Sequence, residues 1–365
     1  MTRFRRRPLA VLALAVAAAA PPPGSPRGWT DPAWFDGLRF HQPQPSTTTS
    51  GEWFRRTFAT HRGPWREFTD TPPGPPPPSC VDGGRLRVTF VNHATVLIQV
   101  DGVNILTDPT WSFRSVPFVG VRRRRPPGLR FEDLPPIDVV LISHDHHDHM
   151  DAPTLERLES RWHPRVVCGL RNAAFLAKIG VPGARELGWW QTTSIAPGMT
   201  VTAVPARHSS GRSLLGKDRT LWCGFVVSAP SGDVYFAGDT GWGAHFPVIA
   251  EAFPRLRLAL LPIGGFQPVW YMRAQHLGPD DAVAAERLLD AGTVVPIHFG
   301  TFPNAGDAEL EPVETLRRAL ARSPDVAARF AVLDNGESLE VPPVPQNPEP
   351  MADSTRTSGG TLGRL

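Results

Sequence analysis

Short apolar stretches and amphipathic stretches alternate along residues 85–341. Residues 95–100 and 103–107 have the pattern of short strands, and Asp101-Gly102 between them predicts a tight hairpin turn. Residues 138–142 are largely apolar and predict a buried strand. Further strands are expected at 85–91, 201–204, 221–228, 233–237, 258–262, 293–297 and 330–334, and helices at 152–161 with Asp151 as N-cap, 171–179, 244–252, 279–291 and 312–322.

Strands in both halves of this region, with helices interspersed, predict an α/β (α+β) protein of the αβ/βα sandwich type. Residues 21–84 precede it and hold 14 of the 41 prolines. They also hold aromatic residues in a number that a disordered linker would not carry, so we expect an irregular arm that packs on the main domain. These aromatic residues are Trp34, Phe35, Phe40, Trp53, Phe54, Phe58, Trp65 and Phe68. Residues 342–365 have no periodic pattern and are expected to form a disordered tail.

The first 20 residues resemble a targeting segment. Four arginines within residues 3–7 precede the apolar run 9–16 and a series of alanines, which is typical of a secretory signal. We therefore expect an exported protein that is periplasmic, secreted or membrane-associated. The cleavage position, an uncleaved membrane tether and a buried first helix all remain open alternatives.

The composition excludes some classes of protein and partner. Hydrophobic residues make up 41% of the chain, which is enough for a buried core and excludes wholesale disorder. Without the four N-terminal arginines, the body has 34 basic and 35 acidic residues, so nothing indicates a nucleic-acid partner. The three cysteines, Cys80, Cys168 and Cys223, lack CxxC spacing and are expected to be buried free thiols rather than a zinc site, with a Cys168–Cys223 disulfide as the alternative in an oxidising compartment. The oligomeric state is not predicted.

A dense histidine and aspartate cluster follows the predicted strand at 138–142. His144 and His146 are two residues apart, so in an extended segment they point the same way, while Asp148 and His149 turn toward a second point. One loop can thus supply two ligands to each of two metal ions. Imidazole and carboxylate suit zinc, and three protein ligands leave a position for water. His147 is the odd residue of the run and is assigned no metal.

Each metal needs a further ligand from elsewhere in the chain. His208, Asp239 and His298 each come just after a predicted strand, and the glycines around Asp239 allow a tight turn. We expect one zinc on His144, His146 and His208, and the other on Asp148, His149 and His298. Asp239 and a hydroxide are expected to bridge the two ions, so that the chain holds two Zn²⁺.

These residues resemble the metallo-β-lactamase superfamily, whose ligand order is HxHxDH followed by His, Asp and His. Within it, the match is closer to the N-acylphosphatidylethanolamine-hydrolysing phospholipase D family and its bacterial relatives. The segments that carry this closer resemblance are Asn92-His93-Ala94-Thr95, Leu106-Thr107-Asp108-Pro109, Leu134-Pro135-Pro136-Ile137-Asp138, Leu187-Gly188-Trp189-Trp190, Phe236-Ala237-Gly238-Asp239-Thr240-Gly241, Pro262-Ile263-Gly264, Gln275-His276 and Ile297-His298-Phe299-Gly300-Thr301-Phe302.

The resemblance implies a four-layer αβ/βα sandwich and a zinc-dependent phosphodiesterase of phospholipase D type. Its substrate would be a phospholipid such as N-acylphosphatidylethanolamine or another small ester, met at a membrane surface. Asp148, Asp239 and His276 are the expected catalytic residues, Gln275 and His276 contact substrate, and Asp108 supports a metal-bound imidazole from behind. His93 has no assigned role. A lactonase or amidase on the same fold, or a non-catalytic metal-binding protein, is the alternative.

Overall fold

The structure is a computed structural model that describes residues 35–43, 62–213 and 216–344. The predicted leader, the tail beyond residue 344 and the arm's Trp34, Trp53, Phe54 and Phe58 lie outside the described residues. The strands within the described residues form two sheets. In spatial order, the first sheet has β13 (Ser338–Val341), β1 (Leu86–Asn92), β2 (Thr95–Val100), β3 (Val103–Thr107), β4 (Val139–Ile142), β5 (Arg165–Gly169) and β6 (Arg185–Leu187). The second has β12 (Thr293–Ile297), β11 (Leu256–Pro262), β10 (Asp233–Phe236), β9 (Gly224–Ser228), β8 (Met199–Val204) and β7 (Thr192–Ala196).

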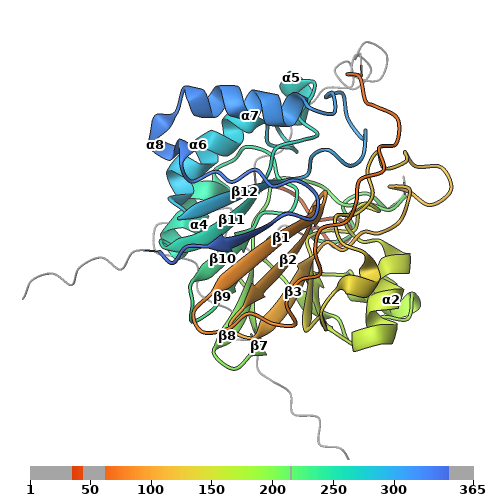
Figure 1. Ribbon diagram of the computed structural model, residues 1–365. Coiled ribbons are helices and arrows are strands. Elements are labelled where there is room, and N and C mark those ends of the chain that lie inside the picture. The colour runs from red at the N-terminus through yellow and green to blue at the C-terminus, as the bar shows by residue number, and fades with distance from the viewer. Residues whose placement is uncertain (1–34, 44–61, 214–215, 345–365) are drawn as a thin grey trace, which may run out of the picture.

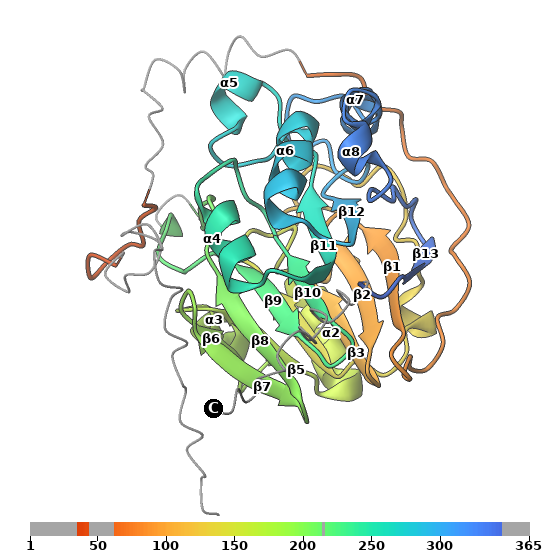
Figure 2. The same cartoon turned by 90° about the vertical axis from the view of Figure 1, so that its left-hand side faces the viewer.

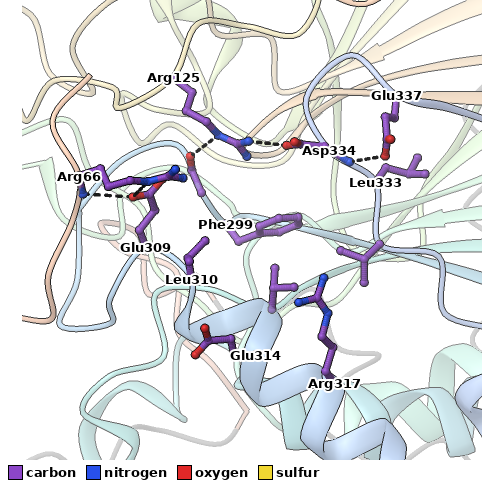
Figure 3. A pocket seen from close by; sticks show the side chains of 13 residues that line it. Arg66, Arg125, Phe299, Glu309, Leu310, Glu314, Arg317, Leu333, Asp334 and Glu337 are labelled. Atoms are coloured by element: carbon purple, nitrogen blue, oxygen red, sulfur yellow. Dashed lines mark hydrogen bonds and ion pairs between the residues drawn. The ribbon is translucent and has the colours of Figure 1, made fainter. Parts of the chain in front are cut away.

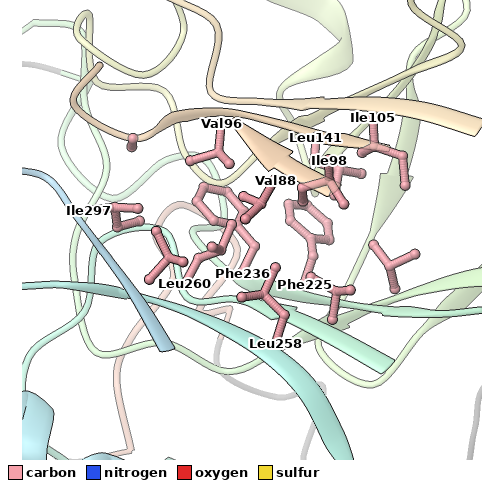
Figure 4. Close-up of a cluster of buried hydrophobic side chains, with 14 of the residues drawn as sticks. Val88, Val96, Ile98, Ile105, Leu141, Phe225, Phe236, Leu258, Leu260 and Ile297 are labelled. Carbon is pink, nitrogen blue, oxygen red and sulfur yellow. The ribbon is translucent and has the colours of Figure 1, made fainter. Parts of the chain in front are cut away.

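The two sheets pack face to face through one apolar core (Figure 4). Val88, Ile98 and Leu141 of the first sheet meet Phe225 and Phe236 of the second, and all five side chains are fully buried. Burying a side chain of this size stabilises the fold by about 1.5–3 kcal/mol, so this layer is the main source of cohesion between the sheets.

Helices cover the outer face of each sheet, which completes the predicted four layers (Figures 1 and 2). Leu155 and Leu158 of α2 and Leu176 of α3 join a second apolar cluster on the first sheet. Phe246 of α4 and Leu289 of α6 join a third cluster on the second sheet. The helices are α2 (Ala152–Trp162), α3 (Ala173–Lys178), α4 (His245–Ala252), α5 (Val269–Met272), α6 (Pro279–Leu289), α7 (Glu311–Ala321) and α8 (Pro324–Ala327), with a 3-10 helix η1 (Phe131–Asp133). No helix among the described residues is long and apolar enough to cross a membrane.

Most predicted elements are present, and the exceptions have physical reasons. The turn between β2 and β3 has positive φ at Asp101 (49°) and Gly102 (77°), as the Asp-Gly pair predicts. Asp151 precedes α2, yet its carboxylate accepts hydrogen bonds from Trp111 N and Ser112 N instead of capping the helix.

The strand expected at 330–334 is wrong. Phe330 makes only an isolated bridge to Val294, and the chain then turns through Gly336 (φ 84°) into β13, where it pairs with β1. Strands β5, β6, β7 and β13 and the short helices α5 and α8 are not predicted from the sequence. Among the three cysteines, Cys168 and Cys223 are buried free thiols as expected, whereas Cys80 is free but exposed.

The described part of the N-terminal arm lies against the body. Phe40 N donates to Asp218 O at 2.7 Å, and Trp65 Nε1 donates to Asp307 O at 2.8 Å. Further along, Gly102 N donates to Val81 O at 2.9 Å, which fastens the end of the arm to the β2–β3 turn.

The strand order brings several strand ends to one edge of the sandwich. Strands β3 to β6 run parallel in the first sheet, and β10 to β12 run parallel in the second. The carboxyl ends of β4, β8, β10 and β12 are each followed within four residues by one of the predicted ligands. The fold therefore collects ligands from loops that are far apart in the sequence.

Candidate metal centre

The structure brings together the three histidines expected on the first metal, of which His144 and His208 are buried and His146 is half-buried. His144 Nε2 lies 2.8 Å from His146 Nδ1, and His208 Nε2 lies 3.2 Å from the same Nδ1 atom. Three imidazole nitrogens that face one point match a tetrahedral zinc site with one position left for water or substrate.

A second cluster forms around the carboxylate of Asp239. Its Oδ2 atom lies 3.2 Å from His149 Nε2 and 3.2 Å from His298 Nε2. Asp148, His149 and His298 offer ligand atoms that all lie within 4.8 Å of one another. The structure thus brings together the three residues expected on the second metal.

Asp239 faces both clusters. The same Oδ2 atom that contacts His149 and His298 lies 3.7 Å from His208 Nε2 and 4.0 Å from His144 Nε2. A carboxylate in this position can bind two cations at once, which is the bridging role expected from the sequence.

The turn that presents Asp239 requires glycine. Gly238 has φ 58°, and a Cβ atom at this position would lie 2.5 Å from the Cβ atom of Ser143. Residue 238 must therefore lack a side chain for β10 to pass this close to the HxHxDH loop.

Burial and neighbouring charges set the protonation of the candidate ligands. Burial lowers the pKa of His144 and His208, so their nitrogens are neutral and can bind a metal. Burial opposes ionisation of Asp239, but His149 and His298 outweigh it and hold the pKa of this carboxyl well below its usual value. Within the described residues, His149 Nε2 and Asp239 Oδ1 are buried without a hydrogen-bond partner. Metal ions would satisfy such atoms, so the donor set fits the expected metals.

Asp108 holds one of these histidines from behind, as the resemblance implies. Its Oδ2 atom lies 2.7 Å from His149 Nδ1, and the backbone N of Ser143 donates to its Oδ1 atom at 2.7 Å. A carboxylate behind an imidazole fixes the ring orientation and directs Nε2 toward the metal.

Two residues that the sequence analysis leaves without a role hold Asp148 in place. Asn304 Nδ2 donates to Asp148 Oδ2 at 2.6 Å, and His93 Nε2 lies 3.2 Å from the same oxygen. The Oδ1 atom of Asp148 is thereby left for a metal. His93 is in a segment of the family resemblance, whereas no sequence signal points to Asn304.

His276, expected to contact substrate, lies beside Asp239 and the candidate metal ligands. Its Nδ1 atom is 3.8 Å from Asp239 Oδ2, and the two residues group with His208 as a further candidate ligand set. Burial lowers the pKa of His276 to about 4, so the ring is neutral near pH 7. Gln275 contributes its backbone, because its carbonyl oxygen lies 2.9 Å from His208 Nδ1.

A cavity of about 340 Å³ opens onto the ligands. Tyr271, Gln275, His276, Ser115 and Asn304 are among the residues that line it. His147 also lines the cavity, with Nε2 3.3 Å from Arg212 O, and it belongs to none of the candidate ligand groups of the described residues. Among the aromatic residues that could bind an acyl chain, Tyr271 lines this cavity, whereas Trp190 and Phe266 are buried, Trp189 and Trp242 pack on the core, and Trp270 is exposed.

A second cavity, of about 390 Å³, is lined in part by Phe299 and contains none of the candidate ligands (Figure 3). Its rim is tied by ion pairs, because Arg66 contacts Glu309 at 2.7 Å and Arg125 contacts Asp334. This cavity therefore lies where the arm meets the start of α7, and we assign it a structural role.

The fold and the ligand clusters define the class of the protein as a metal-dependent hydrolase on a two-sheet sandwich. The family model described as the beta-lactamase superfamily domain matches residues 103–299. The chain belongs to the metallo-β-lactamase superfamily.

Individual relatives agree with this assignment. The chain is 36% identical over 272 residues to N-acyl-phosphatidylethanolamine-hydrolyzing phospholipase D 1 of Caenorhabditis elegans, covering 70% of this chain and 76% of the relative. It is 31% identical over 262 residues to a metal-dependent hydrolase of Methanopyrus kandleri, covering 70% of this chain and 100% of the relative. Among solved structures, a metallo hydrolase from Ignicoccus hospitalis has a TM-score of 0.55 at 26% identity, covering 71% of this chain and 99% of that chain.

Proposed function

We propose that the protein is a zinc-dependent phosphodiesterase of phospholipase D type that hydrolyses phospholipids such as N-acylphosphatidylethanolamine. The observation that carries the proposal is the position of Asp239 Oδ2 between two ligand clusters, because paired cations suit in-line displacement at a phosphodiester. The Caenorhabditis elegans relative supports the substrate class. An exported location, inferred from residues 1–20, is part of the same proposal.

The side chains have separable tasks. Bound zinc would supply Lewis acidity toward the phosphoryl oxygens and would lower the pKa of the attacking water. Asp239 contacts both ligand clusters. Asn304 and His93 hold Asp148 in the second cluster. His276 borders the cavity and can hydrogen-bond the leaving alcohol. In the net reaction, water oxygen bonds to phosphorus and the bond to the head-group oxygen breaks, which yields phosphatidic acid and N-acylethanolamine.

The size of the cavity constrains the bound lipid. A volume of about 340 Å³ is at the small end of the range for ligand pockets. It is large enough for the phosphodiester group, while the two glycerol-linked acyl chains and the acyl chain on nitrogen would remain outside.

The deciding experiment compares three substrates on the metal-loaded protein: N-acylphosphatidylethanolamine, a lactone and the β-lactam nitrocefin. Mass spectrometry should show phosphatidic acid, and metal analysis of protein purified without chelator should show about two zinc ions per chain. Diacylglycerol in place of phosphatidic acid would contradict the position of the cut. Fast lactone opening with no lipid product would favour a lactonase instead.

A further inference from the structure

The loop between β3 and η1 contains a narrow protruding ribbon. Ser115 N donates to Val121 O at 3.0 Å, and Arg123 N donates to Phe113 O at 2.9 Å, so the two sides of the ribbon run antiparallel. Gly120 N donates to Val116 O at 2.9 Å and closes the tip. The ribbon, defined as residues 113–123, therefore has a fixed shape that holds its tip away from the core.

The tip is apolar and exposed. Phe118 is 93% exposed and Val119 is 84% exposed, which are the largest values among the exposed apolar side chains of the described residues. Phe113 is also exposed and packs on Phe68 of the arm, with a distance of 5.9 Å between ring centroids. Adjoining exposed apolar side chains on an ordered ribbon are a candidate interaction surface.

The position of the ribbon links this surface to the metal centre. Ser115 and Val116, which lead into the tip, line the cavity that opens onto the ligands. Tyr271 and Met272 of α5 line the same cavity, and Trp270 of the same helix is exposed. Apolar side chains therefore flank the opening from two separate elements.

The charge near the tip is positive. Residues 110–129 contain five arginines and no acidic residue. Arg125 is paired with Asp334, whereas Arg114 and Arg122 flank the tip and form no ion pair with the described residues. The nearest part of the arm carries Glu67 and Asp70, which partly offset this charge. Exposed apolar side chains flanked by arginines match the surface of a membrane that contains anionic lipids.

We propose that the ribbon and α5 dock the protein on an anionic phospholipid surface, with Phe118 and Val119 inserted among the lipids and the cavity facing the head groups. The docking proposal rests on the proposed function in one respect, the assumption that the substrate is a lipid of the same membrane. It explains how a cavity of head-group size can act on a lipid whose acyl chains remain in the bilayer.

The test is co-sedimentation of the full chain with vesicles of phosphatidylcholine alone or mixed with phosphatidylglycerol. Phe118→Ser should weaken binding at least ~10-fold, because burial of one phenylalanine contributes about 1.5–3 kcal/mol. Arg122→Gln should reduce binding to the mixed vesicles more than to phosphatidylcholine alone. Leu288→Ser removes an apolar side chain on α6 that is 41% exposed, and it should bind like the wild type. Any contribution of residues 9–16 is common to all variants.

Two readouts separate docking from catalysis. Hydrolysis of a soluble phosphodiester, bis(p-nitrophenyl) phosphate, tests the proposed function without a membrane, and Phe118→Ser should leave it unchanged. Vesicle binding is scored on lipids that need not be substrates. Equal binding of Phe118→Ser, Leu288→Ser and the wild type would overturn the docking proposal, as would an absence of wild-type binding. A wild-type dimer that Phe118→Ser converts to a monomer, with unchanged vesicle binding, would assign the tip to self-association instead.

Discussion

Asp239 is the residue on which both ligand clusters depend, because its Oδ2 atom faces His149, His298, His208 and His144 within 4.0 Å. Asp239→Asn removes the negative charge between two cations and replaces one oxygen with a group that binds metal poorly. We expect hydrolytic activity to fall by about 100-fold and zinc content to fall below two per chain. Steady-state kinetics and metal analysis on the same preparation check both effects.

His147 offers the matched control, because it lines the same cavity but lies outside the candidate ligand groups of the described residues. His147→Ala should keep full zinc content and most of the activity. Equal losses for Asp239→Asn and His147→Ala would contradict the ligand assignment. The variant His276→Ala should keep its zinc if His276 contacts only substrate. Loss of zinc would instead show that His276 serves as a further metal ligand.

His93 tests how strongly Asp148 depends on its neighbours. His93→Phe keeps a ring of similar size but removes the contact with Asp148 Oδ2, which then keeps only the hydrogen bond from Asn304. Loss of such a supporting contact typically costs 10–100-fold in metal affinity or activity, so we expect about a tenfold weaker second zinc site. Competition with a chelator would measure it. Asn304→Ala should act in the same direction, and unchanged affinity in both variants would refute the positioning role.

The elements show what a single sequence can and cannot predict. The Asp101-Gly102 turn and the apolar strand β4 are predicted because local backbone preferences and burial act in the same direction there. The HxHxDH run predicts four of the ligands because they are adjacent in the chain. By contrast, β13 pairs with β1 across the whole domain, and Asn304 reaches Asp148 over 156 positions. Such contacts depend on the tertiary fold and leave no local pattern.

The arm is fastened to the segment just before α7. Arg66 contacts the buried carboxylate of Glu309, and this ion pair lowers the pKa of Glu309. Arg66→Ala should leave Glu309 poorly compensated and loosen the arm, because burial of an unpaired carboxylate is unfavourable. Limited proteolysis should then cut within residues 62–80 several times faster, while the sandwich remains protected. A cleavage rate equal to that of the wild type would show that other contacts hold the arm.

Helix α6 contains a buried carboxyl group that makes stability depend on pH. Burial raises the pKa of Glu286 from 4.5 to about 7, although Arg329 contacts it at 2.9 Å. The folded state therefore favours the protonated acid, so this stabilisation is present below about pH 4.5 and is lost as the pH rises through about 7. Glu286→Gln resembles the protonated acid at every pH. Relative to the wild type, its Tm should rise by a few degrees between pH 5 and pH 8. A constant difference in Tm over this range would contradict the shift.

For the molecule as a whole, the metal centre connects the two sheets. The HxHxDH ligands follow β4 of the first sheet, whereas His208, Asp239 and His298 follow strands of the second. A metal ion that binds only the folded state stabilises it by about 4 kcal/mol when its free concentration is a thousandfold above Kd. Removal of metal with a chelator should therefore lower Tm by several degrees, as measured by calorimetry, and added zinc should restore it. An unchanged Tm would show that the apolar core alone holds the sheets together.

The order of the ligands along the chain has a consequence for protein synthesis. The ribosome releases the HxHxDH segment first, so a nascent chain carries four ligands long before His208, Asp239 and His298 exist. A product that ends prematurely, before β12 is complete, lacks His298 and has an incomplete second cluster. Under the proposed function, two-metal chemistry would be confined to chains whose translation has passed β12, and truncated products would lack a complete second metal site.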